Sequence, residues 1–368
     1  MPSCSACGRP FLAADGRRGR PGSRPPSSTR SIRKPWHAAP RPRNSTTAAP
    51  SASSAPGRES ALIRIAHVSD LHVLSRTSAE WRRIIFNKRL TGFVNLVLHR
   101  GRVHRRDYLR TVLSAAAAQA DHLVVTGDIT NLALEREYEE ARALLDEAAL
   151  RTEVTVVPGN HDIYLPSTSR HRRFPHYFER FIQSDLPQLA RDLPAGRFPC
   201  VKLRGRVAII ALSSGVPRAP FVASGYVGQT QLEALKIVLA SPEVQRRTPI
   251  VLMHHPPVDT RPRLVQLRDG LVDATAVRST LAQLTRGLVL FGHLHVRVRC
   301  TLPTPSGKLD VIGASGAALD HPDGSVRAGF NLYEIDDMGS LALVAAYVID
   351  PKNDGLQRMT IAEVPACV

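Results

Sequence analysis

The sequence lacks any apolar run of about 18 residues, the length that a helix needs to cross a membrane. A secretory signal is also not expected, because the apolar stretch Phe11–Ala14 is far too short for its central segment. Five cysteines among 368 residues are few and scattered, which argues against a disulfide scaffold and suits a reducing compartment. These absences predict a cytoplasmic protein and leave peripheral contact with a membrane open.

The first sixty residues show no apolar periodicity. They are rich in Pro, Ser, Ala and Arg, and they hold 11 Lys and Arg residues against two acids, a net charge of +9 out of +17 for the whole chain. Such a segment cannot bury enough apolar surface to offset the entropy that it would lose on folding. We therefore predict that residues 1–60 form a disordered basic tail, although an organelle transit peptide has a similar composition.

From residue 61 onward, apolar runs of strand length alternate with segments of helical periodicity. Helices are predicted within Arg110–Ala120, Ala133–Ala149 and Gln229–Ala240. The predicted strands are Leu62–Val68, His122–Thr126, Val154–Val157, Val207–Ser213, Ile250–Met253 and Leu288–Phe291, then Val296–Leu302, Leu309–Ile312, Gly329–Ile335 and Leu341–Ile349. The alternation predicts an α/β layer fold over residues 61–350, and the late strands predict a second sheet. Residues 351–368 are expected to form a C-terminal extension.

Five of the predicted strands end in the same kind of residue. Each closes on Asp, Asn or His, and five such endings are hard to explain by packing alone. The endings are Asp70-Leu71-His72, Gly127-Asp128, Gly159-Asn160-His161-Asp162, His254-His255-Pro256 and Gly292-His293-Leu294-His295. Because polar ligands in α/β folds gather where strands end, these side chains are expected to form one site.

In this order, the five motifs resemble those of the calcineurin-like metallophosphoesterase superfamily, over roughly residues 62–300. The resemblance implies a four-layer α/β/β/α sandwich with two facing mixed sheets. It also implies a metal-dependent hydrolase of phosphate esters, with a hydroxide that bridges two metal ions as the nucleophile. The motifs are most similar to the bacterial phosphodiesterase-like branch, so a small phosphorylated substrate, and a phosphodiester in particular, is expected.

The donor atoms of this set are oxygen and nitrogen, and no cysteine lies among them to select a soft metal. Divalent ions of the Mn, Fe or Zn class are therefore the expected cofactors, and the resemblance implies two of them. The resemblance implies seven ligands: Asp70, His72 and His295 for one ion, Asn160, His254 and His293 for the other, and Asp128 as the bridge between them. His255 stays an alternative to His254, because Pro256-Pro257 is doubled and each histidine lies two residues before a proline. We choose His254, since it follows the apolar run directly.

His161 is the predicted catalytic residue that is not a ligand. It follows the ligand Asn160, so an imidazolium there would stabilise charge on the phosphoryl group and protonate the leaving oxygen. Some relatives orient this histidine with a carboxylate, whereas this chain has Asn131 near the Gly-Asp motif, which could still orient His161. Asp162 is expected to point into the fold or to hold the loop.

The segment between the first two motifs, residues 76–106, holds nine Arg and Lys residues and one acid, Glu80. Its apolar residues fall into two clusters of partly helical spacing, which predicts a basic cap beside the site. In one interpretation its apolar face packs on the body of the protein and its arginines are solvated. In the other, the cap contacts an anionic lipid headgroup or a membrane surface.

Other functions remain as hypotheses. One is a phosphoesterase that acts on lipid headgroups or nucleotide sugars at a membrane surface. Another class is a catalytically silent binding scaffold, which predicts missing ligand histidines, whereas all expected positions are present. A nucleic-acid-binding protein would use the basic tail, but no aromatic residues are interleaved with its charges, so nucleic acid is not an expected partner.

Overall fold

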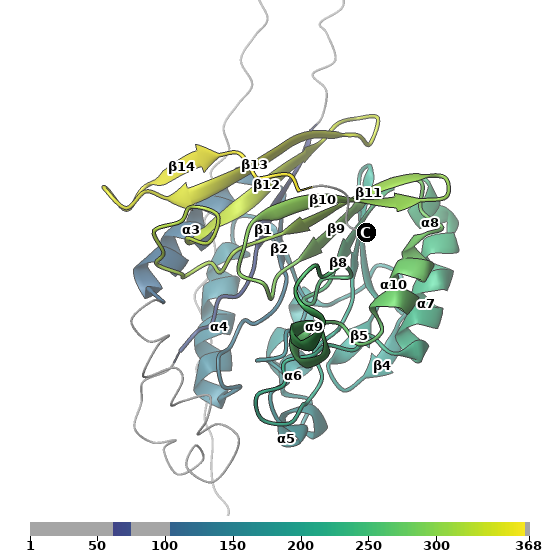
Figure 1. Ribbon diagram of the computed structural model, residues 1–368, viewed down its shortest axis with the longest axis horizontal. Helices are drawn as coiled ribbons and strands as arrows, with labels where there is room; N and C mark the ends of the chain where they lie inside the picture. Colours follow the sequence, from purple (N-terminus) through teal and green to yellow (C-terminus); the bar gives the residue numbers. More distant parts are fainter. Residues whose placement is uncertain (1–61, 75–103, 365–368) are drawn as a thin grey trace, which may run out of the picture. The chain divides into compact units, whose positions relative to one another are not determined.

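The computed structural model describes residues 62–74 and 104–364, which all belong to the unit Arg58–Val368 (Figure 1). The predicted tail, residues 1–60, and residues 76–103 of the predicted cap lie outside the described residues. Two six-stranded sheets form the centre of the described part.

The first sheet has the strand order β14-β13-β12-β1-β2-β3. Its strands are β1 (Ile63–Val68), β2 (His122–Val125), β3 (Glu153–Val156), β12 (Gly329–Ile335), β13 (Leu341–Ile349) and β14 (Leu356–Met359). The pairs β1–β2 and β2–β3 are parallel, while β12 joins β1 antiparallel and β13 and β14 follow as hairpins. The three parallel strands therefore all end at one edge of this sheet.

The second sheet has the order β10-β11-β9-β8-β7-β6. Its strands are β6 (Cys200–Arg204), β7 (Val207–Ala211), β8 (Thr248–Leu252), β9 (Leu288–Phe291), β10 (Val298–Thr304) and β11 (Gly307–Gly313). The central strands β7, β8, β9 and β11 are parallel, and the outer strands β6 and β10 are antiparallel to their neighbours. A separate small hairpin pairs β4 (Arg191–Leu193) with β5 (Gly196–Phe198).

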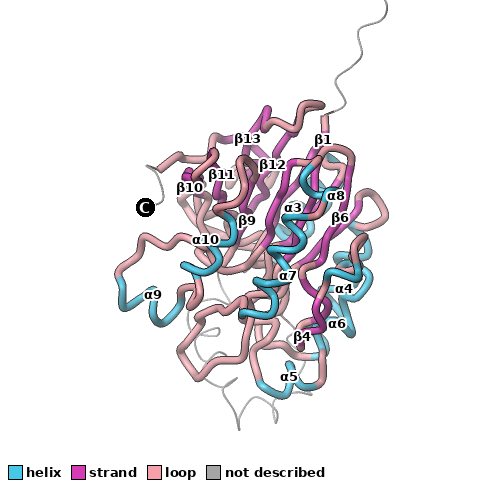
Figure 2. Tube along the Cα trace, turned by 90° about the vertical axis from the view of Figure 1, so that its right-hand side faces the viewer, coloured by secondary structure: helices cyan, strands magenta, loops and turns pink. Residues whose placement is uncertain are grey.

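Helices cover the outer face of each sheet (Figures 1 and 2). Against the first sheet lie α3 (Arg106–Gln119) and α4 (Glu135–Ala148), and against the second lie α7 (Gln229–Ala240), α8 (Pro242–Gln245) and α10 (Ala274–Leu281). Shorter helices occupy connections: α5 (Pro166–Arg170), α6 (Arg173–Phe178), α9 (Arg263–Asp269) and the 3-10 turns Glu179–Phe181 and Pro187–Leu189. The predicted four-layer α/β/β/α fold is confirmed.

The alternation of side chains along each central strand builds two apolar cores. In β8, Ile250 and Leu252 pack in the core that includes the first sheet, whereas Val251 packs with α7 residues such as Leu235 and Val238. Successive residues of a strand point to opposite faces, so a strand with a core on each side is apolar throughout. This is why the central strands were recognisable as continuous apolar runs.

The differences from the predicted elements lie where the apolar signal is weak. The strands β4, β5 and β6 were not predicted, since they are short and carry charged residues between the apolar ones. The expected boundary at residue 350 falls between β13 and β14, which are paired, so part of the predicted extension belongs to the first sheet.

Among the described cysteines, Cys200 is a buried free thiol, and Cys300 is disulfide-bonded despite the scattered spacing.

Glu153 at the edge of the first sheet is bound by two cations from the edge of the second. Lys202 Nζ lies 2.9 Å from its carboxylate, and the Arg204 guanidinium also donates to it, with Nη2 at 2.5 Å. The hydrogen bond from Arg204 lowers the pKa of Glu153 to about 2. Lys202 is almost fully buried, so its side of this ion pair is shielded from water. The ion pair connects β3 to β6.

We predict that Glu153→Gln lowers the free energy of unfolding by roughly 1 to 2 kcal/mol at neutral pH, since it leaves Lys202 buried without its carboxylate. A carboxyl with a depressed folded pKa stabilises the protein above its unfolded pKa, so this contribution should fade as the pH falls from about 5 to 2. Urea unfolding across that range measures both effects. The control Glu139→Gln, in an exposed pair with Arg136, should change stability little, and an equal loss there would contradict the prediction.

Candidate metal centre

The predicted site residues meet where the parallel strands of both sheets end. Asp70 and His72 follow β1, Asp128 follows β2, and Asn160 and His161 follow β3, all in the first sheet. His254 follows β8, and His293 and His295 follow β9, in the second sheet. The eight side chains thus come from five strand ends on two sheets, and the structure brings all of them together.

Five of these residues adopt a left-handed backbone conformation. Asp70, His72, Asp128, His293 and His295 have φ angles between 44° and 64°. This region costs a residue other than glycine about 1 kcal/mol or more, and such residues collect at functional sites. Backbone hydrogen bonds hold the bends in place, with Asp70 N donating to Gly127 O at 3.0 Å and His72 N to Asp128 O at 2.9 Å. These left-handed residues turn their side chains toward the centre of the site, whereas extended strands would point the same side chains elsewhere.

Two motif glycines are required because other motifs pass so close to them. A Cβ atom on Gly159 would lie 2.2 Å from Asp128 Oδ1, and one on Gly292 would lie 1.8 Å from Ser69 Oγ and 2.7 Å from Asp70 Oδ2. Real Cβ atoms do not approach other atoms so closely. Each glycine therefore allows the contact between one motif and the carboxylate of another.

The first group of ligand-type side chains is Asp70, His72 and His295. Asp70 Oδ1 lies 3.0 Å from His295 Nε2 and 3.8 Å from His72 Nε2, and the two imidazole nitrogens are 3.3 Å apart. Asp70 Oδ1 is buried and makes no hydrogen bond within the described residues. Burial and the neighbouring His161 hold the pKa of His72 well below its ordinary value, so its ring is neutral and offers a lone pair.

The second group forms around His254. Its Nδ1 lies 2.7 Å from Thr126 O and must donate there, so in the neutral ring Nε2 carries a lone pair. That Nε2 faces Asn160 Oδ1 at 3.1 Å and Asp128 Oδ2 at 3.4 Å. Three acceptors that converge repel each other unless a cation or a proton lies between them. Burial alone would lower the pKa of His254, but Asp128 raises it to about 9, which shows how strongly this point favours positive charge.

His293 and His255 complete this side of the site in different ways. His293 Nε2 donates to Asp269 O at 2.7 Å, which leaves its Nδ1 for another partner. Both ring nitrogens of His255 are already engaged, since Nδ1 lies 2.9 Å from Ser214 Oγ and Nε2 lies 2.9 Å from Ala223 O. His255 belongs to a third candidate group with His254 and His293, but its hydrogen bonds favour His254 as the ligand.

Asp128 lies between the two groups. Its Oδ2 is 3.4 Å from His254 Nε2, and 4.0 Å from both His72 Nε2 and His161 Nε2. Burial alone would raise the pKa of Asp128, but His254 and His161 hold it well below its ordinary value. Asp128 is therefore an ionised, buried carboxylate with imidazoles on both sides, which is the position expected of a bridge.

His161 stands beside Asp128, and the two form a further candidate metal-binding group with His72, although the sequence predicts His161 as a catalytic residue and not as a ligand. Its backbone N donates to Asp128 Oδ1 at 2.8 Å, and its Nδ1 lies 2.5 Å from the carbonyl oxygen of Asn131. The expected orienting residue is thus Asn131, but the backbone carbonyl makes the contact. Asp162 is fully buried and accepts hydrogen bonds from Gly159 N at 2.9 Å and Thr130 N at 2.8 Å, so it holds the loop as predicted.

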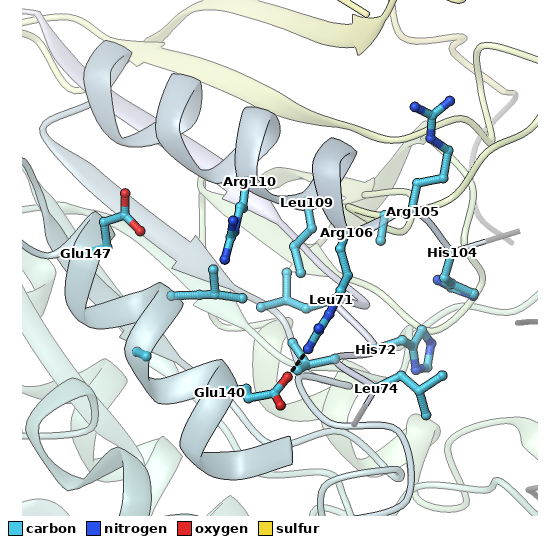
Figure 3. Close-up of a pocket in the computed structure, with 14 residues that line it drawn as sticks. Leu71, His72, Leu74, His104, Arg105, Arg106, Leu109, Arg110, Glu140 and Glu147 are labelled. Carbon is cyan, nitrogen blue, oxygen red and sulfur yellow. Dashed lines mark hydrogen bonds and ion pairs between the residues drawn. The ribbon is translucent and has the colours of Figure 1, made fainter. Parts of the chain in front are cut away.

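A cavity of about 640 Å³ opens beside His72, between α3 and α4 (Figure 3). Leu71, Leu109 and Leu144 provide apolar walls, and Arg110 is among the polar residues that line it. Figure 3 shows Arg106 reaching across the cavity to Glu140, its partner in an ion pair. No local sequence pattern predicts this cavity, since its lining combines residues 71–74, 104–110, 140–147 and 318, which meet only in the fold.

The chain belongs to the calcineurin-like phosphoesterase family, whose model matches residues 63–297. It is 31% identical over 205 residues to a protein of Rhodococcus erythropolis named "Probable cyclic nucleotide phosphodiesterase", covering 52% of this chain and 58% of that one. It is 26% identical over 194 residues to a glycerophosphodiester phosphodiesterase of Enterobacter lignolyticus, covering 53% and 57%. The chain thus spans less than three fifths of the length of each relative.

Among solved structures, a purple acid phosphatase from yellow lupin (Lupinus luteus) seeds has a similar fold, with a TM-score of 0.52 at 11% identity. The similarity covers 84% of this chain and 55% of that one. The family depends on two metal ions, and the described residues contain candidate ligand groups on both sides of Asp128. The buried Asp70 oxygen without a hydrogen bond, the converging acceptors at His254 and the neutral imidazoles fit such ions.

We predict that Asp128→Asn lowers the bound metal from two ions per chain to at most one, because the variant removes the charge of the carboxylate that lies between the two groups. Metal analysis after dialysis against a metal-free buffer measures the content. The control Asp310→Asn alters a carboxylate that pairs with Arg299 on the second sheet and should leave the metal content unchanged. Full occupancy in Asp128→Asn would show that this carboxylate is not the bridge.

The choice between the adjacent histidines has a direct test. His254→Ala should lose one metal ion, whereas His255→Ala should keep both and instead weaken the loop near Ala223 that it holds. Metal content and thermal unfolding of both variants separate the two effects. The reverse pattern, with metal lost only from His255→Ala, would make His255 the ligand.

Proposed function

We propose that the protein is a metal-dependent phosphoesterase that hydrolyses phosphodiesters. The observation that supports this most is the arrangement around Asp128. Donor groups around Asp70 and around His254 face this one buried carboxylate, and His161, whose Nε2 lies 4.0 Å from Asp128 Oδ2, stands beside it. Two metal sites with a shared carboxylate and an adjacent proton donor suit phosphoryl transfer.

The proposed ligands are the seven expected from the sequence: Asp70, His72 and His295 for one ion, Asn160, His254 and His293 for the other, and Asp128 for both. Divalent ions of the Mn, Fe or Zn class would polarise the phosphoryl group and, with a bridging hydroxide, provide the nucleophile. The protein itself fixes the donors. Thr126 O holds the ring of His254 and Asp269 O holds the ring of His293, so each imidazole is oriented before any ion binds.

His161 is the proposed general acid. Its Nδ1 contact with Asn131 O fixes the ring so that Nε2 points to the centre, 4.0 Å from Asp128 Oδ2. A proton held on Nε2 can pass to the leaving alcohol oxygen as the phosphorus–oxygen bond breaks. The imidazolium also balances the charge that builds up on the phosphoryl group.

The preference for diesters rests on the relatives and on the cavity. The names of both curated relatives describe enzymes that cleave phosphodiesters. A diester carries a second alcohol that a monoester lacks, and the cavity beside His72 has room for such a group. Its leucine walls favour an alcohol with an apolar part.

The competing hypotheses differ in their support. A catalytically silent scaffold would be expected to have lost ligands, whereas all seven and His161 are present and close together. A lipid-headgroup or nucleotide-sugar substrate, and the lipid contact through residues 76–106, stay predictions, since most of that segment lies outside the described residues. The cytoplasmic location also stays a prediction. None of the helices in the described part has the length and apolar character to cross a bilayer.

A panel of phosphate monoesters and diesters, assayed with protein reconstituted with Mn²⁺, Fe²⁺ or Zn²⁺, tests the proposal. We expect turnover of diesters that depends on metal and exceeds turnover of matched monoesters. Metal-free protein and the Asp128→Asn variant are the controls. Hydrolysis that survives in both, or no hydrolysis of any ester at full metal occupancy, would refute the proposed function.

We predict that His161→Ala keeps its metal ions and loses roughly 10² to 10⁴ in kcat, the usual range for removal of a general acid. The loss should be smallest for esters with very acidic leaving alcohols, because these need no proton. A plot of log kcat against leaving-group pKa should therefore be steeper for the variant than for the wild type. Parallel plots would count against proton donation, and lost metal would make His161 a ligand.

A further inference from the structure

The hydrogen bond that orients His161 continues beyond the candidate metal centre into the protein. His161 Nδ1 donates to Asn131 O at 2.5 Å. The peptide group that contains this carbonyl also contains the N–H of Leu132, which donates to Glu137 Oε2 at 2.7 Å. One peptide group therefore accepts from an imidazole through its oxygen and donates to a carboxylate through its nitrogen.

Glu137 lies in the first turn of α4 and is fully buried. Its Oε2 also accepts from Asn131 N and from Leu134 N, each at 3.2 Å. Three N–H groups that converge on one oxygen favour an ionised carboxylate, which can only accept. The N-terminus of α4 stabilises negative charge at the same place. Glu137 is therefore a buried negative charge that residues 131–134 surround with their N–H groups.

Helix capping explains only part of this arrangement. A glutamate at the third position of a helix commonly accepts from the N–H of the residue before the helix, which here is Leu134. That contact is longer than the contact with Leu132, which lies outside the helix. Capping also gives no reason for the carbonyl of the same peptide group to face His161. A capping role alone predicts an effect on stability, whereas the connection to His161 predicts an effect on catalysis.

A peptide group transmits polarity from one of its partners to the other. A charged acceptor at the N–H draws electron density toward the carbonyl oxygen, so the hydrogen bonds of such a chain strengthen each other. Asn131, Leu132 and Glu137 are each 3% exposed or less, so water screens this effect little. The Asn131 carbonyl is therefore a stronger acceptor for His161 than the carbonyl of a loop without the carboxylate would be.

We propose that Glu137 is a positioning residue that orients His161 through the peptide group between them. This inference rests on the proposed function, in which His161 gives its Nε2 proton to the leaving alcohol. Because the Nδ1 proton is held by Asn131 O, Nε2 faces the centre of the site, 4.0 Å from Asp128 Oδ2. Glu137 fixes the loop that carries this carbonyl, and so keeps the ring in the orientation that proton donation needs.

Glu137→Gln removes the charge and keeps the size of the side chain. At wild-type metal content, we expect kcat for esters of weakly acidic alcohols to fall roughly tenfold, because the chain loses its charged acceptor. Esters with very acidic leaving alcohols should change little. In the His161→Ala background, Glu137→Gln should cause no further loss, since Glu137 acts through His161. Glu137→Asp keeps the charge and should recover most of the lost rate.

Asp273→Asn is the matched control. The Asp273 carboxylate also holds a loop through backbone N–H groups, those of Val227 at 3.1 Å and Gly228 at 2.8 Å. It has no part in the chain of hydrogen bonds that ends at His161. Asp273→Asn should therefore leave the dependence of kcat on leaving-group pKa unchanged, even if it lowers the thermal stability.

NMR of the metal-free protein tests the chain of hydrogen bonds without an assay of activity. In the wild type, the neutral ring of His161 should carry its proton on Nδ1, and the Leu132 amide proton should resonate well downfield because its acceptor is charged. In Glu137→Gln, both protons should move upfield. The two wild-type measurements keep the proposal testable if the variant does not fold.

Four results would overturn the proposal. The first is wild-type kcat for every ester in Glu137→Gln, and the second is loss of metal from that variant. The third is an equal loss for all leaving groups that persists in the His161→Ala background, which would leave Glu137 with a capping role. The fourth is an Nε2 proton on the neutral His161 ring of the wild type. If the wild type hydrolyses no ester, the proposed function fails, while the NMR measurements still decide whether Glu137 orients His161.

Discussion

Two buried carboxylates, Asp70 and Asp128, are the constraint on which the site and much of the surrounding fold depend. Ionised oxygens away from water cost far more free energy than they return unless positive charge or hydrogen-bond donors meet them. Imidazoles meet Asp128 on both sides, and backbone N–H groups of His161 and His293 reach Asp128 and Asp70. These contacts cross from one sheet to the other, so the buried charge ties the two halves of the sandwich together.

The strained strand ends bring the buried carboxylates and their imidazole partners together. A regular strand sends alternate side chains to opposite faces, where the apolar cores lie. Left-handed residues directly after β1, β2 and β9 break that alternation and release polar side chains at the sheet edge. Their conformational cost sums to several kcal/mol, which the apolar packing of the central strands outweighs. A rigid, well-buried scaffold therefore carries a strained polar edge.

The sequence predicted the central parts of the fold and named candidate site residues that the structure brings together, and it failed where backbone atoms decide. The bounds of α7, β9, β12 and β13 agree with the prediction, because these elements have long or continuous apolar patterns. The sequence favoured His254 over His255 only because His254 follows the apolar run directly, whereas the structure adds contacts of the two rings with carbonyl oxygens of Thr126 and Ala223, which any residue type would supply. The same applies to Asn131, whose carbonyl and not its amide contacts His161. The cavity beside His72 and the pairing of β14 likewise arise from tertiary packing, which leaves no local pattern.

The first ligand group has a consequence for how the protein forms. Asp70 and His72 come from the first strand of the described domain, whereas His295 follows β9, more than 220 residues later in the sequence. Contacts between residues so distant in sequence form slowly, because the chain must lose the entropy of closing a long loop before the contacts can stabilise it. A nascent chain that has not yet released β9 from the ribosome lacks His293 and His295, one proposed ligand for each proposed ion. If the proposed ligands hold, metal capture is therefore a late event in the life of the chain, and we expect loss of an ion to weaken the closure of the whole sandwich.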